Sequence, residues 1–201
     1  MTDSYKTLEK NTEEILFKDK GSKFYATAFP LSDPEDMNEI LSELNKKHPK
    51  AGHHCYAWKI GSGDDNYRIN DDGEPRNSAG ATIYGQIQSY ELSDVAVVVS
   101  RIFGGTKLGV SGLINAYKTS AALALDKAEI ITKVITEDII VQFEYPQMSQ
   151  IMRWIDENGL LIKKQNLTAS CEMVISVPQS KVQEHIELLN SWHPIIAKEN
   201  I

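Results

Sequence analysis

An acidic loop is the first candidate for chemistry in this sequence. Residues 70–75 read Asn-Asp-Asp-Gly-Glu-Pro, which places the carboxylates of Asp71, Asp72 and Glu74 close together. Carboxylate oxygens bind hard divalent cations, and they accept hydrogen bonds from the Arg and Lys side chains of a partner. The loop lacks the later bidentate Glu of an EF-hand. The structural alternative is a turn whose Asp and Gly residues set its geometry and whose charges favour the start of the next helix.

A glycine-rich segment is the second candidate. Residues 101–112 read RIFGGTKLGVSG and lead from an apolar run into a helix-like segment. Amide groups at the start of such a helix, with Arg101 and Lys107 nearby, can hold a phosphate or a carboxylate. The segment matches neither the Walker pattern nor Gly-x-Gly-x-x-Gly. The alternative is a connection in which Gly104 and Gly105 supply positive φ angles and close backbone approach.

The run His53-His54-Cys55 is the third candidate, and we interpret it as structural. Adjacent residues of a strand point to opposite faces, so His54 cannot activate Cys55. A zinc site needs about four ligands, and the sequence has no second Cys/His cluster. We therefore expect Cys55 to be buried as a small apolar residue, and Cys171 likewise. No catalytic residue, metal site or cofactor is predicted.

The elements that carry these segments are strands and helices in mixed order. Alternating and continuous apolar runs predict strands, and apolar residues at helical spacing predict helices. We expect the helices to cover one side of a sheet. The predicted strands are 14–18, 23–30, 53–60 and 95–100, with a second short strand at 66–70. The predicted helices are one capped by Asp33 and stopped by Pro49, one over 78–90 and one starting at residue 111.

A change in texture near residues 131–134 predicts two domains, 1–133 and 134–201. Only Gly159 of the 12 glycines lies beyond residue 131. The second part has the order βαββαβ, the split-βαβ or ferredoxin-like arrangement. Its predicted strands are 135–144, 160–168, 171–177 and 194–198, and its predicted helices are 145–158 and 178–190.

Composition places the chain among ordinary globular proteins. It has 201 residues, 41% of them hydrophobic and 24% charged, and a net charge of −7. Two cysteines cannot form a disulfide framework, and the polar N-terminal residues contain no secretory signal. No apolar run spans a bilayer, so we expect a cytoplasmic protein with no membrane contact. The acidic balance argues against coating a nucleic-acid duplex by bulk charge, although it leaves room for a local basic patch.

The sequence resembles the YigZ/IMPACT family over about residues 18–127. The resemblance rests on a series of short blocks in a fixed order. These are Gly21-Ser22-Lys23-Phe24-x-Ala26, His54-x-Tyr56-Ala57, Asp71-Asp72-Gly73-Glu74-Pro75, Arg101-x-Phe103-Gly104-Gly105-x-Lys107-Leu108-Gly109 and Gly112-Leu113-x-x-Ala116-Tyr117. The chain departs from the family pattern at Ile102, Ser111 and Asn115, where the family has an aromatic, a glycine and a basic residue.

The resemblance implies an α+β fold with two domains. The N-terminal domain of such proteins is similar to the second domain of a small-subunit ribosomal protein and to domain IV of elongation factor G. The C-terminal domain is similar to domain V of that factor. Eukaryotic relatives act in translational control, by competing for an activator of a kinase of initiation factor 2.

These features predict a non-catalytic binding protein of the translation apparatus. It would contact RNA, the ribosome or a translation-associated protein and regulate translation, as a monomer or weak homo-oligomer without a cofactor. The alternative is a small-ligand or nucleotide-binding enzyme that uses the glycine-rich and acidic loops. We expect the two loops to meet on one side of the larger sheet. The candidate binding residues are Lys23, His54, Arg68, Asp71, Asp72, Glu74, Arg101, Gly104, Gly105 and Lys107.

Overall fold

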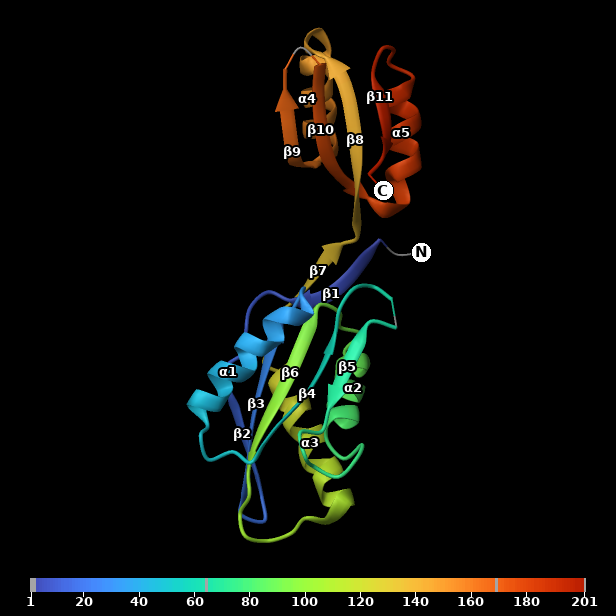
Figure 1. Cartoon of the computed structure of the whole chain (residues 1–201). Helices are drawn as coiled ribbons and strands as arrows, with labels where there is room; N and C mark the ends of the chain where they lie inside the picture. Colours follow the sequence, from blue (N-terminus) through green and yellow to red (C-terminus); the bar gives the residue numbers. More distant parts are fainter. Residues whose placement is uncertain (1–2, 64, 169, 201) are drawn as a thin grey trace. The chain divides into compact units, whose positions relative to one another are not determined.

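The computed structural model describes residues 3–63, 65–168 and 170–200. The chain divides into two compact units, one of Tyr5–Lys133 and one of Val134–Ile201 together with the first four residues (Figure 1). The described residues form five α-helices, two large antiparallel sheets and a sheet of two strands. The predicted α+β class is therefore confirmed. No helix among these residues is both long and apolar enough to cross a membrane.

The first unit is built on a five-stranded antiparallel sheet. The central strand β6 (Val95–Ile102, VAVVVSRI) is buried at every position but the last. It pairs with β3 on one side and β4 on the other, so its apolar run has sheet neighbours at both edges. The spatial order is β2 (Ile15–Asp19), β3 (Ser22–Pro30), β6, β4 (His53–Lys59) and β5 (Tyr67–Asn70).

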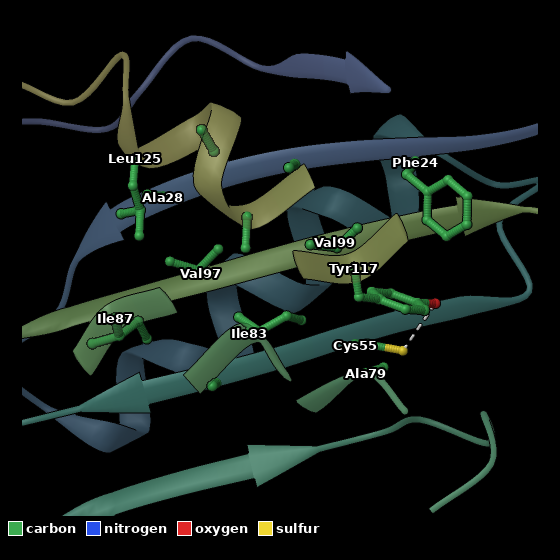
Figure 2. Packing of buried hydrophobic residues seen from close by; sticks show 14 of the residues in the cluster. Phe24, Ala28, Cys55, Ala79, Ile83, Ile87, Val97, Val99, Tyr117 and Leu125 are labelled. Carbon is green, nitrogen blue, oxygen red and sulfur yellow. Dashed lines mark hydrogen bonds between the residues drawn. The ribbon is translucent and has the colours of Figure 1, made fainter. Parts of the chain in front are cut away.

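Helices cover both faces of this sheet. Helices α2 (Gly80–Ser89) and α3 (Gly109–Leu125) pack on the face that carries Val97 and Val99, in the larger core shown in Figure 2. Helix α1 (Met37–Lys47) covers the opposite face, which carries Val98. The expectation that helices cover one side of the sheet is therefore wrong. A strand that is apolar at successive positions needs apolar cover on both faces, and α1 supplies the second cover.

The helix that Asp33 is predicted to cap starts as a short 3₁₀ turn, and α1 itself begins at Met37. The turn η1 (Pro34–Asp36) has Pro34 in its first turn, and the side chain of Asp33 accepts a hydrogen bond from the Glu35 amide. Similar turns precede the two helices of the second unit, η2 (Tyr145–Gln147) and η3 (Gln179–Lys181).

Two strands near the predicted domain boundary were not predicted. β1 (Ser4–Leu8) and β7 (Ile130–Val134) pair in a sheet of their own. Both are short, and most of their side chains are exposed or half-buried, which weakens the apolar periodicity that would reveal them.

The second unit has the predicted order βαββαβ. Its strands lie in the order β11-β8-β10-β9, and all pairs are antiparallel. Gly159 ends the first helix with a φ of 60°. The predicted turn between residues 168 and 171 includes Ala169, which lies outside the described residues. The elements are β8 (Thr136–Glu144), α4 (Met148–Asn158), β9 (Leu161–Leu167), β10 (Ser170–Pro178), α5 (Val182–Asn190) and β11 (Ile196–Glu199).

Each unit holds one cysteine in its core. Cys55 lies among the residues of the larger core of the first unit, and Cys171 lies in the core of the second. Both side chains have an exposure of 0%. The prediction that both are buried is confirmed.

Candidate binding site between two loops

Asp71 folds the acidic loop over the start of α2. Its Oδ1 accepts hydrogen bonds from the amides of Ala79 (3.0 Å) and Gly80 (2.8 Å), and its Oδ2 accepts one from Asn77 (2.8 Å). The first amides of a helix have no partner within the helix, so a carboxylate placed there satisfies them and interacts favourably with the helix dipole. The Asp71 carboxylate therefore has a structural role, because its oxygens accept hydrogen bonds from backbone amides.

Asp72 fastens the same loop to the start of β4. Its Oδ2 accepts a hydrogen bond from the His54 amide at 2.6 Å, and its carbonyl oxygen lies 2.7 Å from Nδ1 of His53. The backbone then turns through two residues of positive φ, Asp72 at 42° and Gly73 at 83°. Glycine adopts such angles without steric cost, and Asp tolerates them better than most residues.

Glu74 points into the protein and pairs with Arg101. Its Oε1 lies 2.6 Å from Nη1 of Arg101 and accepts a second hydrogen bond, of 2.8 Å, from the Tyr117 hydroxyl. The Glu74 and Arg101 residues are 9% and 6% exposed. Such a buried pair holds its partners together because leaving either charge alone in the interior is costly.

Arg101 is packed between two aromatic rings. Its guanidinium carbon lies 5.5 Å from the ring centre of Phe24 and 5.7 Å from that of Phe103, within the range of cation–π contacts. Its Nε is buried and has no hydrogen-bond partner among the described residues.

Cys55 lies beneath this ion pair and is chemically quiet. Its Sγ lies within hydrogen-bond distance of two oxygen atoms, the Asp71 carbonyl at 3.0 Å and the Tyr117 hydroxyl at 3.3 Å. Figure 2 shows the contact with Tyr117. Burial raises the pKa of the Cys55 thiol, and burial likewise raises the pKa of the Tyr117 hydroxyl. A nucleophilic cysteine needs a thiolate, so this environment disfavours covalent chemistry.

Gly104 brings the tip of the β2–β3 hairpin against the glycine-rich loop. A Cβ at this position would lie 1.9 Å from the Gly21 carbonyl carbon and 2.1 Å from the Ser22 nitrogen, so only glycine fits. The Gly104 amide donates to Oγ of Ser22 at 3.2 Å. Gly105 and Gly109 follow with φ angles of 90° and 73°, which turn the chain into α3.

The two loops meet around a pocket of about 300 Å³. The acidic loop supplies one wall, and the glycine-rich loop with the first turns of α3 supplies the rest. Arg101 reaches it from the end of β6, and the lining is mostly apolar. The lining residues are Glu74, Pro75, Arg101, Phe103, Lys107, Leu108, Gly109, Val110 and Leu113.

Three of the predicted residues line this pocket, namely Glu74, Arg101 and Lys107. Gly104 and Gly105 belong to the glycine-rich loop and are exposed, but they are not among the residues that line the pocket. Asp71 and Asp72 hold the acidic loop in place. Lys107 is exposed and has no ion-pair partner among the residues that the structure describes.

Strand alternation places the remaining three on the other face of the sheet. Lys23 pairs with Ile102 and so points away from the face of its neighbour Phe24. His54 is buried, and its Nδ1 lies 2.7 Å from Oγ of Ser100. Arg68 stands opposite Trp58, a residue of the core beneath α1, and is exposed.

Sequence reasoning missed Phe103 and Tyr117 as parts of the site. Phe103 is 55% exposed although it is aromatic, and it stacks over Arg101. The available signal was an aromatic residue between a buried strand and two glycines. Tyr117 lies on the apolar stripe of α3, which hides the role of its hydroxyl.

The carboxylates of the acidic loop do not form a metal cage. Within residues 3–63, 65–168 and 170–200, no group of three His, Cys, Asp or Glu side chains is placed to hold a metal ion. Asp71 faces the backbone amides of α2, and Glu74 faces Arg101.

Comparison with known proteins identifies the family. A model described as the Impact N-terminal domain matches residues 20–125. The IMPACT family member YvyE of Bacillus subtilis is 28% identical over 93% of this chain and 86% of its own length. A crystal structure described as a hypothetical protein superposes with a TM-score of 0.77 at 25% identity, covering 100% of both chains. A structure of the two-domain translational regulator Yih1 is 25% identical over 59% of this chain and 46% of that chain, with a TM-score of 0.36. This chain therefore belongs to the IMPACT family.

Proposed function

We propose that this chain is a non-catalytic RNA-binding protein of the translation apparatus that regulates translation. Its contact surface is a basic rim on the N-terminal unit. The rim starts on the face of the β2–β3 hairpin that carries Lys18 and Lys23, passes the tip of the hairpin at Lys20 and reaches the pocket between the two loops. The rim consists of Lys18, Lys20, Lys23, Arg76 and Lys107, all of which are exposed. It modifies the predicted set, because Arg68 and the acidic loop lie outside it.

The proposal rests on a difference between acidic and basic side chains: those of the acidic loop are hydrogen-bonded within the protein, and those of the rim are unpaired among the described residues. The acidic side chains of the loop, Asp71, Asp72 and Glu74, accept hydrogen bonds from within the protein. The five basic side chains of the rim have no ion-pair partner among the described residues. Although the chain has a net charge of −7, the rim thus presents several unpaired positive charges. Unpaired Lys and Arg side chains are the groups that neutralise phosphates in nucleic-acid binding.

One pair of the rim supports an anionic ligand directly. Lys18 on β2 and Lys23 on β3 stand opposite each other in the antiparallel register. Like charges placed directly across two strands repel each other and destabilise the sheet. A phosphate bound between them would neutralise that repulsion. Phosphate binding would therefore remove a destabilisation that is present in the free hairpin.

The remaining parts of the rim are brought together by backbone contact. The hairpin between Lys18 and Lys23 touches the glycine-rich loop where Gly104 approaches Gly21. Lys107 follows three residues later, and Pro75, the neighbour of Arg76, lines the same pocket as Lys107. An extended anion can therefore run along the rim.

We also propose the domain identities that the resemblance implies. Residues 1–133 would be a domain similar to domain IV of elongation factor G, and residues 134–201 one similar to its domain V. The antiparallel order β11-β8-β10-β9 supports the second assignment, since it is the order expected of a split-βαβ fold. The translational setting follows from the eukaryotic relatives that the resemblance points to.

The test measures the binding of a labelled single-stranded RNA to the full chain over a range of salt concentrations. Lys107→Glu and Lys23→Glu should each weaken binding. Replacing either lysine by Gln should reduce the slope of log K against log salt by about 0.7, the value for one lost phosphate contact on a single strand. The matched control is Lys127→Glu, because Lys127 is exposed and follows the far end of α3.

Co-sedimentation with ribosomes tests the setting. The wild-type chain should sediment with ribosomes in low salt, and Lys107→Glu should not. The basic rim would be ruled out if the wild-type chain did not bind RNA. It would also be ruled out if Lys107→Glu and Lys127→Glu bound RNA with equal affinity. Association with ribosomes that survives nuclease treatment would assign the contact to a protein instead.

A further inference from the structure

The pocket that the basic rim reaches has an apolar lining, which phosphate binding does not explain. Its walls are largely apolar, with Leu108, Val110 and Leu113 on one side and Pro75 on the other. Phe103 and Val110 are 55% and 53% exposed, so the pocket has an exposed hydrophobic surface next to Lys107. Its volume of about 300 Å³ is at the lower limit for small-ligand pockets, which suits one small planar group.

The Phe103 ring is held in place by Arg101 and can stack on a planar ligand. One face of its ring lies over the Arg101 guanidinium, and Arg101 is fixed from behind by Phe24 and by the ion pair with Glu74. Only the other face of Phe103 is available to a ligand. Because the ring is braced before binding, little side-chain entropy remains to be lost when a planar group stacks on it.

A phosphate joined to that planar group would meet donors at the same pocket. Helix α3 begins at Gly109 without a side-chain cap, so its first amides remain available. Lys107 lines the pocket and has no ion-pair partner among the described residues. The Nε of Arg101 is a further donor without a partner in that part of the chain.

We propose that the pocket takes one unpaired RNA base, stacked on Phe103, while its phosphate contacts Lys107 and the start of α3. This inference rests on the proposed function and deepens it, because it selects single-stranded RNA or a loop over a duplex. A base within a duplex is stacked and paired, so it cannot enter a pocket without being extruded. Every base has a flat face that can stack on an aromatic ring, so the site tolerates different bases.

The experiment compares three probes by fluorescence anisotropy with the full chain. The probes are a single-stranded RNA, a duplex of the same sequence, and the single strand with a run of abasic sites. The wild-type chain should bind the single strand most tightly. Phe103→Ala should weaken that binding roughly 5- to 150-fold, as one lost base–aromatic stack does, and should leave duplex binding unchanged.

Two further variants separate stacking from folding. Phe103→Trp keeps a stacking ring and should restore binding. Leu123→Ala removes another exposed apolar side chain (37%), which lies near the C-terminal end of α3 and outside the pocket lining, and should bind like wild type. A 2-aminopurine placed in the RNA should change its fluorescence on binding to wild type and not on binding to Phe103→Ala.

The outcomes distinguish this inference from the proposed function. If the wild-type chain binds RNA with normal salt dependence, but Phe103→Ala binds as tightly or abasic RNA binds equally well, the pocket is not a base site and the basic rim stands. If the wild-type chain binds none of the probes, the proposed function fails and this inference fails with it.

Discussion

Arg101 and Glu74 are 27 residues apart in sequence, and their side chains lie 2.6 Å apart in the interior of the N-terminal unit. The contact joins the end of the central strand β6 to the acidic loop. It therefore fixes the distance between the two loops that form the pocket. The ion pair therefore links the two loops structurally.

Arg101→Met should cost about 3–5 kcal/mol in the free energy of unfolding, because it leaves the Glu74 carboxylate buried without its arginine. The Tyr117 hydroxyl still donates to this carboxylate, and His53 Nε2 lies 4.0 Å from it. Adding Glu74→Gln to this variant should recover part of the loss, since the unpaired charge is then gone. Urea denaturation of both variants measures this. A loss below about 1 kcal/mol in the single variant would mean that the pair behaves as an exposed one.

Asp71→Ala should destabilise the N-terminal unit by about 0.5–2 kcal/mol, the range for removal of a carboxylate that accepts helix-start amides. Three amides lose their acceptor in this variant. Asp71→Asn keeps one side-chain oxygen and should lose less. Thermal unfolding compares the two, and an alanine variant as stable as wild type would contradict the role given to Asp71.

Gly104→Ala should cost about 1–3 kcal/mol or more, because the added Cβ would lie 1.9 Å from the Gly21 backbone and one of the two segments must move. Gly85→Ala is the matched control. Gly85 lies inside α2 with no atom within 4 Å of a built Cβ, so alanine should stabilise that helix by up to about 1 kcal/mol. Opposite signs for the two variants are expected in urea denaturation.

Gly104→Ala should also displace the β2–β3 hairpin and so weaken RNA binding at the basic rim. If Gly104→Ala and Gly85→Ala were equally stable and bound RNA equally, the backbone contact at Gly104 would not position the rim.

The stability of the N-terminal unit should fall as the pH is lowered below about 6.5. Burial lowers the pKa of His54 from its usual 6.5, so near and below that pH the unfolded chain binds more protons than the folded chain. Stability from this group is complete above the unfolded pKa and is lost as the pH falls. His54→Gln should reduce the change in urea midpoint between about pH 7.5 and pH 5.5.

His185 offers the same test in the second unit, since burial lowers its pKa as well. It stacks edge-on against Trp154, in a core separate from that of His54. His185→Gln should leave the pH dependence of the N-terminal unit as it is. An unchanged slope in His54→Gln would assign the effect to other groups.

The sequence predicted most elements because their burial is simple. The alternating strands β3 and β4 and the continuous run of β6 each have an apolar pattern that reports their position in the sheet. The two-stranded sheet of β1 and β7 was not predicted, because its residues are largely exposed and therefore show no clear apolar pattern. The number of helices could be predicted, but the face covered by α1 could not, because the pattern of a helix gives its buried stripe and not the side of the sheet that it meets.

The acidic loop shows why the site was harder to predict. Three carboxylates in a short segment suggested a surface offered to a cation or a partner. In the structure these carboxylates accept hydrogen bonds from backbone amides at the start of α2, from an amide of β4 and from Arg101. These contacts join residues that are 6 to 27 positions apart, so spacing alone could not reveal them. Of the proposed basic rim, Lys23 and Lys107 were among the predicted binding residues. The approach of Gly21 to Gly104 spans most of the N-terminal unit, so spacing could not reveal it.

The placement of one buried cysteine in each unit has a practical consequence. Cys55 and Cys171 are the chain's two cysteines, and neither is exposed in the folded state. A thiol reagent can react only when the surrounding core opens, so labelling at each site reports local unfolding of a single unit. Without any engineered probe, mass spectrometry of the two labelled peptides would follow the opening rates of the two units in the same sample.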